Sequence, residues 1–252
     1  MESGHVSVET ANGIATVRFG HPKGNSLPGS LLRRIADTID AVAADASAQV
    51  IVVRSSEPGP FCAGASFDEL RAIEIAETGK EFFMGFARVI LAMRRCPKLI
   101  IARVHGKAVG GGVGIVAAAD YAIATSAASV KLSELAIGIG PFVVGPAIER
   151  KIGAGAFQAL AIDATGWRDA DWAERHGLFA QVVSDGAALD ESVAALAGQL
   201  ARSNPEATAK LKQSFWEGTD DWPSRLEERA GMSGALVVST FTRNAIAAFA
   251  AR

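Results

Sequence analysis

Two turns of small residues and one glutamate are the features of this sequence whose types and spacing suggest chemistry. The first turn spans 61–68 (FCAGASFD) and the second spans 106–114 (GKAVGGGVG). Glu134 follows in the segment 131–135 (KLSEL), which leads into a turn at 138–141 (GIGP). Small residues between a strand and a helix leave backbone N–H groups free to bind an anion or a polarised carbonyl. Two such turns can form an oxyanion hole, beside which a carboxylate can move protons.

The glycine clusters are also compatible with roles that involve no oxyanion hole. Glycines can serve only to let a helix pack closely on a strand. Residues 112–117 (GVGIVA) match the dinucleotide fingerprint GxGxxA, and Glu134 lies about where the ribose-binding acid is expected. However, Asp120 ends the following helix early and a strand at 121–125 begins at once, which disfavours a nicotinamide-dependent oxidoreductase. A Walker loop is excluded because no Gly-Lys-Ser/Thr follows the glycines.

The composition restricts the class of protein. About half of the 252 residues are apolar and a fifth are charged, as in a globular protein with a well-filled core. The formal net charge of -2 and the lack of a basic run argue against a nucleic-acid partner. Cys62 and Cys96 form no CxxC pair or Cys/His cluster, so neither a disulfide framework nor a metal site is expected. Residues 1–9 lack the features of a signal peptide and no apolar stretch reaches the length of a bilayer span, so we expect a cytoplasmic protein without a membrane partner.

The elements that must position these residues alternate between strand and helix. Val6 and Val8, the Asn12-Gly13 turn and the apolar residues between 14 and 19 predict a β-hairpin. Apolar periodicity predicts further strands at 49–54, 99–104, 121–125 and 179–183, and helices at 31–42, 67–75, 82–93, 147–152, 156–164 and 170–176. Beyond about residue 190 only helices are predicted, at 189–202, 205–216, 222–233 and 236–249. This order predicts an α/β body followed by a helical segment.

The three segments, in this order and at these separations, resemble the crotonase superfamily, which is the enoyl-CoA hydratase/isomerase family. The resemblance covers nearly the whole chain. It implies an α/β fold in which residues 1–190 form a crotonase-like spiral of ββα repeats that binds acyl-CoA. It also implies that residues 191–252 form a C-terminal helical oligomerisation segment in a homotrimer or a dimer of trimers. No metal or separate cofactor is implied, because CoA arrives as part of the substrate.

The resemblance also assigns roles to individual residues. Segment 62–65 (CAGA) resembles the family's first oxyanion turn and segment 110–112 (GGG) its second, which implies that Ala65 and Gly111 donate the two N–H groups. Residues 25–27 (NSL) resemble the segment that lies near the adenine of CoA. The CoA-binding residues that the resemblance implies are Asn25, Ser26, Leu27, Ala63, Ala65, Phe67 and Gly111.

The residues at positions 134 and 114 bear on the choice between hydration and isomerisation. In many hydratases of the family two glutamates hold the attacking water; Glu134 matches the second position, whereas Gly114 occupies the first. One carboxylate is enough to carry a proton between C2 and C4 of an enoyl-CoA, because two N–H groups stabilise the enolate as it forms. We therefore expect an enoyl-CoA hydratase/isomerase in which isomerisation is favoured and hydration is close behind.

The same residues are compatible with a protein that does not use Glu134 as a base. The chain is alternatively a non-catalytic acyl-CoA-binding member of the family, and Glu134 is alternatively a surface acid at a helix N-terminus. Asp68, Glu69, Glu74 and Glu77 follow the first turn and could supply the missing carboxylate, although acids on such a helix usually face solvent. The four histidines form no visible cluster with acids or cysteines, and the four tryptophans are expected to pack helices or a subunit interface.

Overall fold

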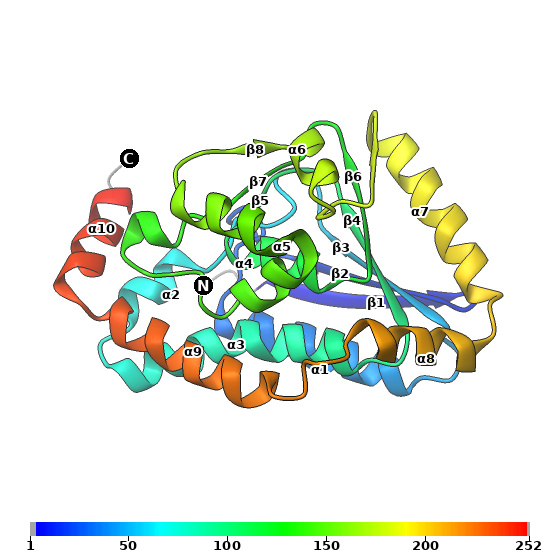
Figure 1. The fold of residues 1–252 in the computed structure, drawn as a ribbon, viewed down its shortest axis with the longest axis horizontal. Helices are drawn as coiled ribbons and strands as arrows, with labels where there is room; N and C mark the ends of the chain where they lie inside the picture. Colours follow the sequence, from blue (N-terminus) through cyan, green and yellow to red (C-terminus); the bar gives the residue numbers. More distant parts are fainter. Residues whose placement is uncertain (1–3, 251–252) are drawn as a thin grey trace.

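The computed structural model describes residues 4–250, with side chains described up to residue 248, as two sheets surrounded by helices (Figure 1). Residues 1–3 and 251–252, at the ends of the predicted body and of the predicted helical segment, lie outside the described residues. The main sheet has the order β1-β2-β3-β4-β6-β9, and a smaller sheet has the order β5-β7-β8. The α/β fold class predicted from the sequence is thus confirmed.

The main sheet begins with the predicted hairpin. β1 (His5–Ala11) and β2 (Ile14–Gly20) are antiparallel, and the two residues between them, Asn12 and Gly13, have φ values of 52° and 79°. Positive φ at both central residues is what a tight two-residue hairpin turn requires. Four parallel strands follow across the sheet: β3 (Val50–Ser55), β4 (Leu99–Val104), β6 (Tyr121–Thr125) and β9 (Gln181–Val183).

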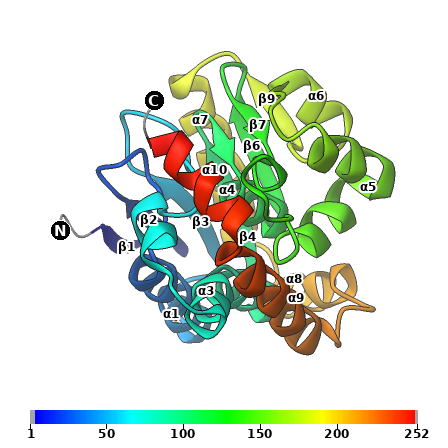
Figure 2. The ribbon, with the colours of Figure 1, turned by 90° about the vertical axis from the view of Figure 1, so that its left-hand side faces the viewer.

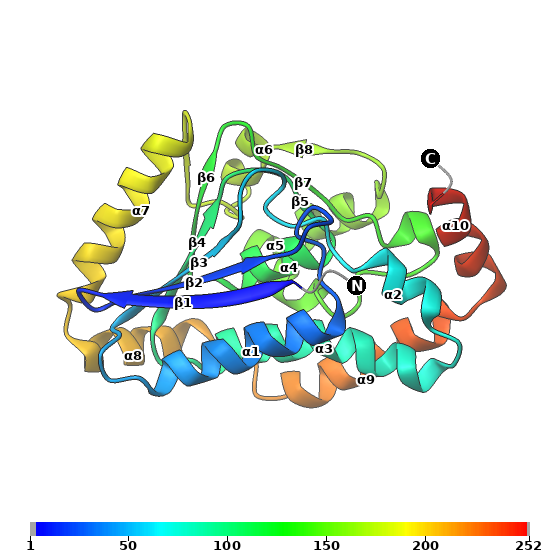
Figure 3. The same ribbon diagram turned by 180° about the vertical axis from the view of Figure 1, so that it is seen from behind.

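Helices cover both faces of the main sheet at β3, β4 and β6, whose alternate side chains point to opposite faces, whereas β1 is largely exposed. On one face, Val52 and Ile101 pack against Leu189 and Val193 of α7 (Gly186–Ala201). The other face belongs to the larger core and is covered by helices that lie together in Figures 1 and 3. These helices are α1 (Gly29–Ala44), α3 (Ala76–Arg95) and, against α3, α9 (Trp222–Val237).

The smaller sheet was not predicted from the sequence. Its strands are β5 (Ala108–Val109), β7 (Ser129–Lys131) and β8 (Arg168–Asp169), which are too short to show an alternating apolar pattern. β5 and β7 are parallel, and β5 leads through Gly110 into α4 (Gly111–Ala118). This sheet therefore holds the second glycine turn in place.

The remaining helices follow the predicted order with shifted ends. They are α2 (Phe67–Ala72), α5 (Gly145–Ile162), α6 (Ala170–Arg175), α8 (Pro205–Phe215) and α10 (Thr240–Ala250). A predicted break inside α5 is present at Gly153, whose φ of 79° interrupts the helix. The helix predicted at 236–249 begins later, because α9 continues to Val237 and the Ser239 hydroxyl accepts a hydrogen bond from the Thr242 N–H at the start of α10. The proposed boundary at residue 190 falls inside α7.

The C-terminal helices fold back on their own chain. α9 runs antiparallel to α3, with Gly234 packed against Gly79 at one end and Asp220 bonded to Arg94 at the other. α10 then lies beside α2, at the opposite end of the molecule from α7 (Figures 1 and 2). None of the helices between residues 4 and 250 combines the length and apolar character that a bilayer span requires.

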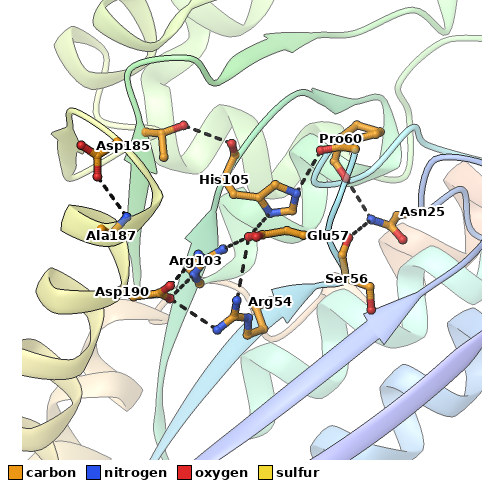
Figure 4. Close-up of polar contacts among 12 residues, drawn as sticks. Asn25, Arg54, Ser56, Glu57, Pro60, Arg103, His105, Asp185, Ala187 and Asp190 are labelled. Carbon is orange, nitrogen blue, oxygen red and sulfur yellow. Dashed lines mark hydrogen bonds and ion pairs between the residues drawn. The ribbon is translucent and has the colours of Figure 1, made fainter.

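A buried arginine joins α7 to the loops that lead into both small-residue turns (Figure 4). Arg103, at the end of β4, has a side chain that is only 2% exposed. Its Nε and Nη2 donate to the Asp190 carboxylate at 2.6 and 3.0 Å, and its Nη1 donates to Glu57. His105 approaches the same Glu57 with Nδ1 at 3.5 Å, and its Nε2 lies 3.0 Å from the Gly59 carbonyl oxygen. The segments before the two turns are therefore tied to each other and to the helix that covers the sheet.

We predict that Asp190→Ala lowers the free energy of unfolding by roughly 2–3 kcal/mol, because it leaves part of a buried guanidinium without its charged acceptor. Arg103 also holds the pKa of the Asp190 carboxyl below its ordinary value, as expected for an acid that is stabilised in its charged form. Urea denaturation at pH 7 measures the change. The neighbouring exposed residue supplies the control, Glu191→Ala, which should change stability by less than about 0.5 kcal/mol. Equal effects of the two substitutions would contradict the prediction.

Candidate active site

The first turn directs one backbone N–H toward a cavity. Leu27 pairs with Ala65 in a parallel bridge, in which the Leu27 N–H donates to the Gly64 carbonyl at 2.8 Å and the Ser66 N–H donates to the Leu27 carbonyl at 3.2 Å. In such a bridge the middle residue, Ala65, points its own N–H away from the partner strand. Ala65 lines the cavity, and no described residue accepts a hydrogen bond from its N–H. The donor that the sequence implied is therefore free.

The second turn presents another free N–H from the start of α4. Gly110 has a φ of 52°, and its N–H donates to the Lys131 carbonyl at 2.9 Å. Gly111 is the first residue of α4, where backbone N–H groups have no partner within the helix. A Cβ atom at Gly111 would lie 2.0 Å from Cε1 of Phe86, so only glycine fits this position.

Backbone hydrogen bonds join the two turns directly. The Cys62 N–H donates to the Lys107 carbonyl at 3.1 Å, and the Val109 N–H donates to the Cys62 carbonyl at 2.9 Å. A Cβ atom at Gly64 would lie 3.0 Å from the Val109 carbonyl oxygen, which shows how closely the two segments approach. Ala65 and Gly111, which are far apart in sequence, thus line the same cavity.

Glu134 lines the same cavity beside the second turn. It precedes a short 3₁₀ helix (Leu135–Ile137), and its carboxylate lies against Gly110, where a Cβ atom would be 2.9 Å from Oε1. The Oε2 atom is buried and has no hydrogen-bond partner among the described residues. Burial raises the pKa of the Glu134 carboxyl to about 7, because the charged form loses its hydration. A carboxyl with a pKa near neutrality can both accept and return a proton.

The cavity that contains these groups is apolar. Its walls include four phenylalanines, Phe67, Phe83, Phe86 and Phe142, the second and third of which come from α3. Glu134 is the single ionisable side chain among the described lining residues, and the other polar side chains are serines. The full set of described lining residues is Ala63, Gly64, Ala65, Phe67, Leu70, Phe83, Phe86, Gly110, Gly111, Ser133, Glu134, Ile137, Ile139, Gly140, Pro141, Phe142, Val143, Val144 and Ser233. Such a cavity suits an apolar group with one polarised carbonyl.

Gly114 occupies the position where a second glutamate would lie in a two-carboxylate site, and it has no room for a side chain. A Cβ atom there would lie 2.6 Å from Cγ1 and 2.7 Å from Cβ of Val144. The acids considered as substitutes do not line the cavity within the described residues. Asp68 forms an ion pair with Lys23, and Glu69 accepts a hydrogen bond from the Gly29 N–H at 2.7 Å.

The segment 25–27 supports the first turn from behind. The Asn25 side-chain amide donates to the Ser56 and Pro60 carbonyls at 2.8 and 2.9 Å, and its Oδ1 accepts from the His21 N–H at 3.0 Å. The Ser26 hydroxyl lies 3.1 Å from His21 Nδ1, and Leu27 is fully buried. These three residues do not line the cavity, whereas Ala63 and Phe67, also predicted to bind CoA, do. The hydrogen bonds of Asn25 stabilise the loop behind the first turn. Contact between residues 25–27 and CoA stays a prediction.

The cavity-lining residues that come from α3 and α9 were not predicted from the sequence. Phe83 and Phe86 follow an apolar helical pattern, which indicated burial but not the surface that they bury. Ser233 lies on α9, about a hundred positions beyond Glu134, and carries no motif that would have marked it. Across residues 4–250, no group of three or more His, Cys, Asp or Glu side chains is placed to hold a metal ion.

Comparison with known proteins identifies relatives along most of the chain. Mitochondrial methylglutaconyl-CoA hydratase of Rattus norvegicus is 34% identical over 134 residues, which are 53% of this chain and 42% of that protein. The match therefore spans less than half the length of that hydratase and of its human and mouse counterparts. The 4-chlorobenzoyl coenzyme A dehalogenase-1 of Arthrobacter sp is 30% identical over 230 residues, which are 86% of this chain and 79% of that protein.

Solved structures and a family model extend the comparison to the whole fold. The enoyl-CoA hydratase from Bacillus halodurans matches with a TM-score of 0.88 at 22% identity, over 96% of this chain and 99% of that one. A Legionella pneumophila protein described as an enoyl-CoA hydratase/isomerase (crotonase) matches with a TM-score of 0.79 at 28% identity, over 85% and 83% of the two chains. The family model for enoyl-CoA hydratase/isomerase matches residues 9–251. With this fold and a match of that extent, the chain belongs to the enoyl-CoA hydratase/isomerase family and has the crotonase fold.

Proposed function

We propose that this protein stabilises the thioester enolate of an enoyl-CoA with the N–H groups of Ala65 and Gly111 and moves the proton with Glu134. One observation carries the proposal. The Glu134 carboxylate lies against Gly110, next to the free N–H of Gly111, and no other described residue lining the cavity can ionise. A base and an anion-stabilising site are thus held together in an apolar environment, where each hydrogen bond to the enolate is stronger than in water.

The proposed steps need only these groups. Glu134, in its ionised form, removes a proton from C2 of a 3-enoyl-CoA, and the electron pair moves onto the thioester oxygen. The N–H groups of Ala65 and Gly111 hydrogen-bond that oxygen as it becomes negative, an effect worth roughly 3 kcal/mol of barrier for each donor. Protonated Glu134 then returns the proton at C4, and the double bond forms between C2 and C3. The product is the conjugated 2-enoyl-CoA, and the base is regenerated.

The single carboxylate favours isomerisation over hydration. Hydration through two acids requires a second carboxylate to hold the water, and Val144 fills the space at Gly114 where this acid would project. Hydration is the second candidate, because several relatives are named as hydratases, including the short-chain-enoyl-CoA hydratase of Clostridium acetobutylicum at 28% identity. A single glutamate could serve this reaction by taking a proton from water and returning it at C2.

Assembly and CoA contacts extend the proposal. We propose a homotrimer or a dimer of trimers, which light scattering of the purified protein can test. Apolar side chains that are exposed in the isolated chain, such as Ile162 at 73% and Phe241 at 69%, are consistent with burial in an assembly.

We also propose that Ala63 and Phe67 contact the CoA portion of the substrate near the first turn.

We predict that Glu134→Gln lowers kcat by at least about 1000-fold while the affinity for acyl-CoA changes little, because the amide cannot accept the C2 proton. The measurement is mass spectrometry of 3-hexenoyl-CoA and crotonyl-CoA after incubation with each protein in heavy water. Isomerisation appears as conversion of the first substrate to its conjugated isomer, which is separated by chromatography because the two esters have the same mass, and hydration appears as a gain of one water by the second. Glu228→Gln, an exposed substitution on α9, is the control. Full activity in the Glu134 variant would exclude the proposed role, and affinity without any exchange would favour an acyl-CoA-binding protein.

The raised pKa of Glu134 predicts the pH dependence of activity. Because the base must be ionised and its pKa is about 7, kcat/KM should rise about tenfold per pH unit below 7 and level off above it. Initial rates between pH 5 and 9 with a limiting concentration of substrate measure this profile. A profile that is flat between pH 5.5 and 8 would show that a group with an ordinary carboxyl pKa, or no carboxyl, controls the reaction.

The same pKa predicts a cost in stability. The native state holds the Glu134 proton more tightly than the unfolded state, so stability should fall as pH rises from about 4.5, the ordinary value, through about 7. Above pH 7 the ionised carboxylate costs about 3 kcal/mol, and Glu134→Gln should recover most of it. Urea denaturation at pH 5 and pH 8 tests this: the gain should be about 3 kcal/mol at pH 8 and less than about 1 kcal/mol at pH 5. A variant that is less stable than the unmodified protein at pH 8 would contradict the prediction.

A further inference from the structure

Ser233 is a polar residue without a partner in the wall of the apolar cavity. It lies on α9, it is one of the residues that line the cavity, and it is only 1% exposed. Its hydroxyl makes no hydrogen bond to any residue that the structure describes, unlike Ser224 on the same helix, which donates to the Asp221 carbonyl at 2.9 Å. A serine hydroxyl that no protein group engages is available as a donor and an acceptor to a molecule in the cavity. A polar group of a bound ligand would supply the missing hydrogen-bond partner.

The helix contacts place Ser233 away from the oxyanion site. α9 crosses α3 where Gly234 meets Gly79, and a Cβ atom at Gly79 would lie 2.9 Å from the Gly234 Cα. Phe86, which packs against Gly111, lies two turns further along α3, about 10 Å along the helix axis. Ser233 therefore lines the cavity about two helical turns along α3 from the residue that packs on Gly111, an offset that matches the far part of a short acyl chain whose thioester lies at Gly111.

The charges around the cavity favour a neutral group at this end. No described lining residue carries a positive charge, and Glu134 carries the negative charge when it acts as a base. Arg229, one turn before Ser233 on α9, is held to the backbone by a 3.3 Å hydrogen bond from Nη1 to the Phe142 carbonyl and lies outside the lining. A carboxylate beside Ser233 would be desolvated without a cation, whereas a hydroxyl or carbonyl oxygen would need only the serine O–H.

We propose that Ser233 determines specificity by hydrogen-bonding a neutral oxygen, of a hydroxyl or carbonyl group, near the far end of a short acyl chain. The inference rests on the proposed function for the position of the thioester at Ala65 and Gly111. It names the substrates as enoyl-CoA esters that carry an oxygen substituent, rather than plain hydrocarbon chains. In this arrangement α9 selects the substrate, and the two small-residue turns and Glu134 perform the chemistry.

Binding of saturated thioesters tests the proposal without requiring turnover. Isothermal titration compares hexanoyl-CoA with its 4-, 5- and 6-hydroxy derivatives and with the dicarboxylic analogue, adipoyl-CoA. At least one hydroxy derivative should bind about tenfold tighter than hexanoyl-CoA, which corresponds to about 1.4 kcal/mol. Ser233→Ala should abolish this difference and leave hexanoyl-CoA affinity unchanged or slightly improved. Ser224→Ala, on the same helix but outside the cavity, should preserve the difference.

Each other outcome overturns the inference in a distinct way. Equal affinity for hexanoyl-CoA and all three hydroxy derivatives would show that Ser233 recognises no oxygen there. Tightest binding of adipoyl-CoA would show that the site takes a carboxylate, with Arg229→Gln as the variant that should then lose it. A preference that survives Ser233→Ala would assign recognition to another group. Failure of the proposed function is separate, because it is seen as a lack of Glu134-dependent exchange with any thioester, whatever the binding result.

Discussion

The pairing of Cys62 with Lys107 and Val109 is the interaction on which the site depends. Two backbone hydrogen bonds join segments that enter different helices, and they bring Ala65 and Gly111 to the same cavity. Neither turn alone presents two donors to one oxygen. The strands behind the turns, the small sheet and the Arg103 ion pairs hold this pairing in place, so the main sheet serves as a support for two N–H groups.

Burial of Glu134 works against the stability of the fold and in favour of its chemistry. An acid in this position would be stabilised by a hydrogen-bond donor or a cation, yet its Oε2 has no partner among the described residues. The resulting pKa of about 7 leaves the carboxyl able to exchange a proton at neutral pH. A partner that satisfied the carboxylate would lower its pKa and weaken it as a base. The lack of a partner at Oε2 is therefore easier to explain by proton transfer than by folding.

The sequence predicted the parts of the molecule that have a local signature. The hairpin was predicted from Asn12-Gly13, the helices from their apolar period, and both turns from runs of small residues. The small sheet was missed because strands of two or three residues have no detectable period. The remaining cavity walls were missed because they depend on which residues meet in space: Phe86 with Gly111, and Val144 with Gly114. Asn25 was linked to the substrate, and its side chain proved to be bonded to two backbone carbonyls of the neighbouring loop.

The close packing of Val144 on Gly114 links the absence of a second acid to the structure of the whole site. A glutamate at Gly114 would have to displace Val144, which belongs to the segment that leads into α5 and carries Phe142. The same segment is held by Arg229 of α9, the helix that also supplies Ser233. Restoring a second carboxylate would therefore disturb the acyl-binding wall and α9 together. Through these contacts the choice of one acid rather than two is coupled to the shape of the cavity, and with it to the substrates that the cavity can hold.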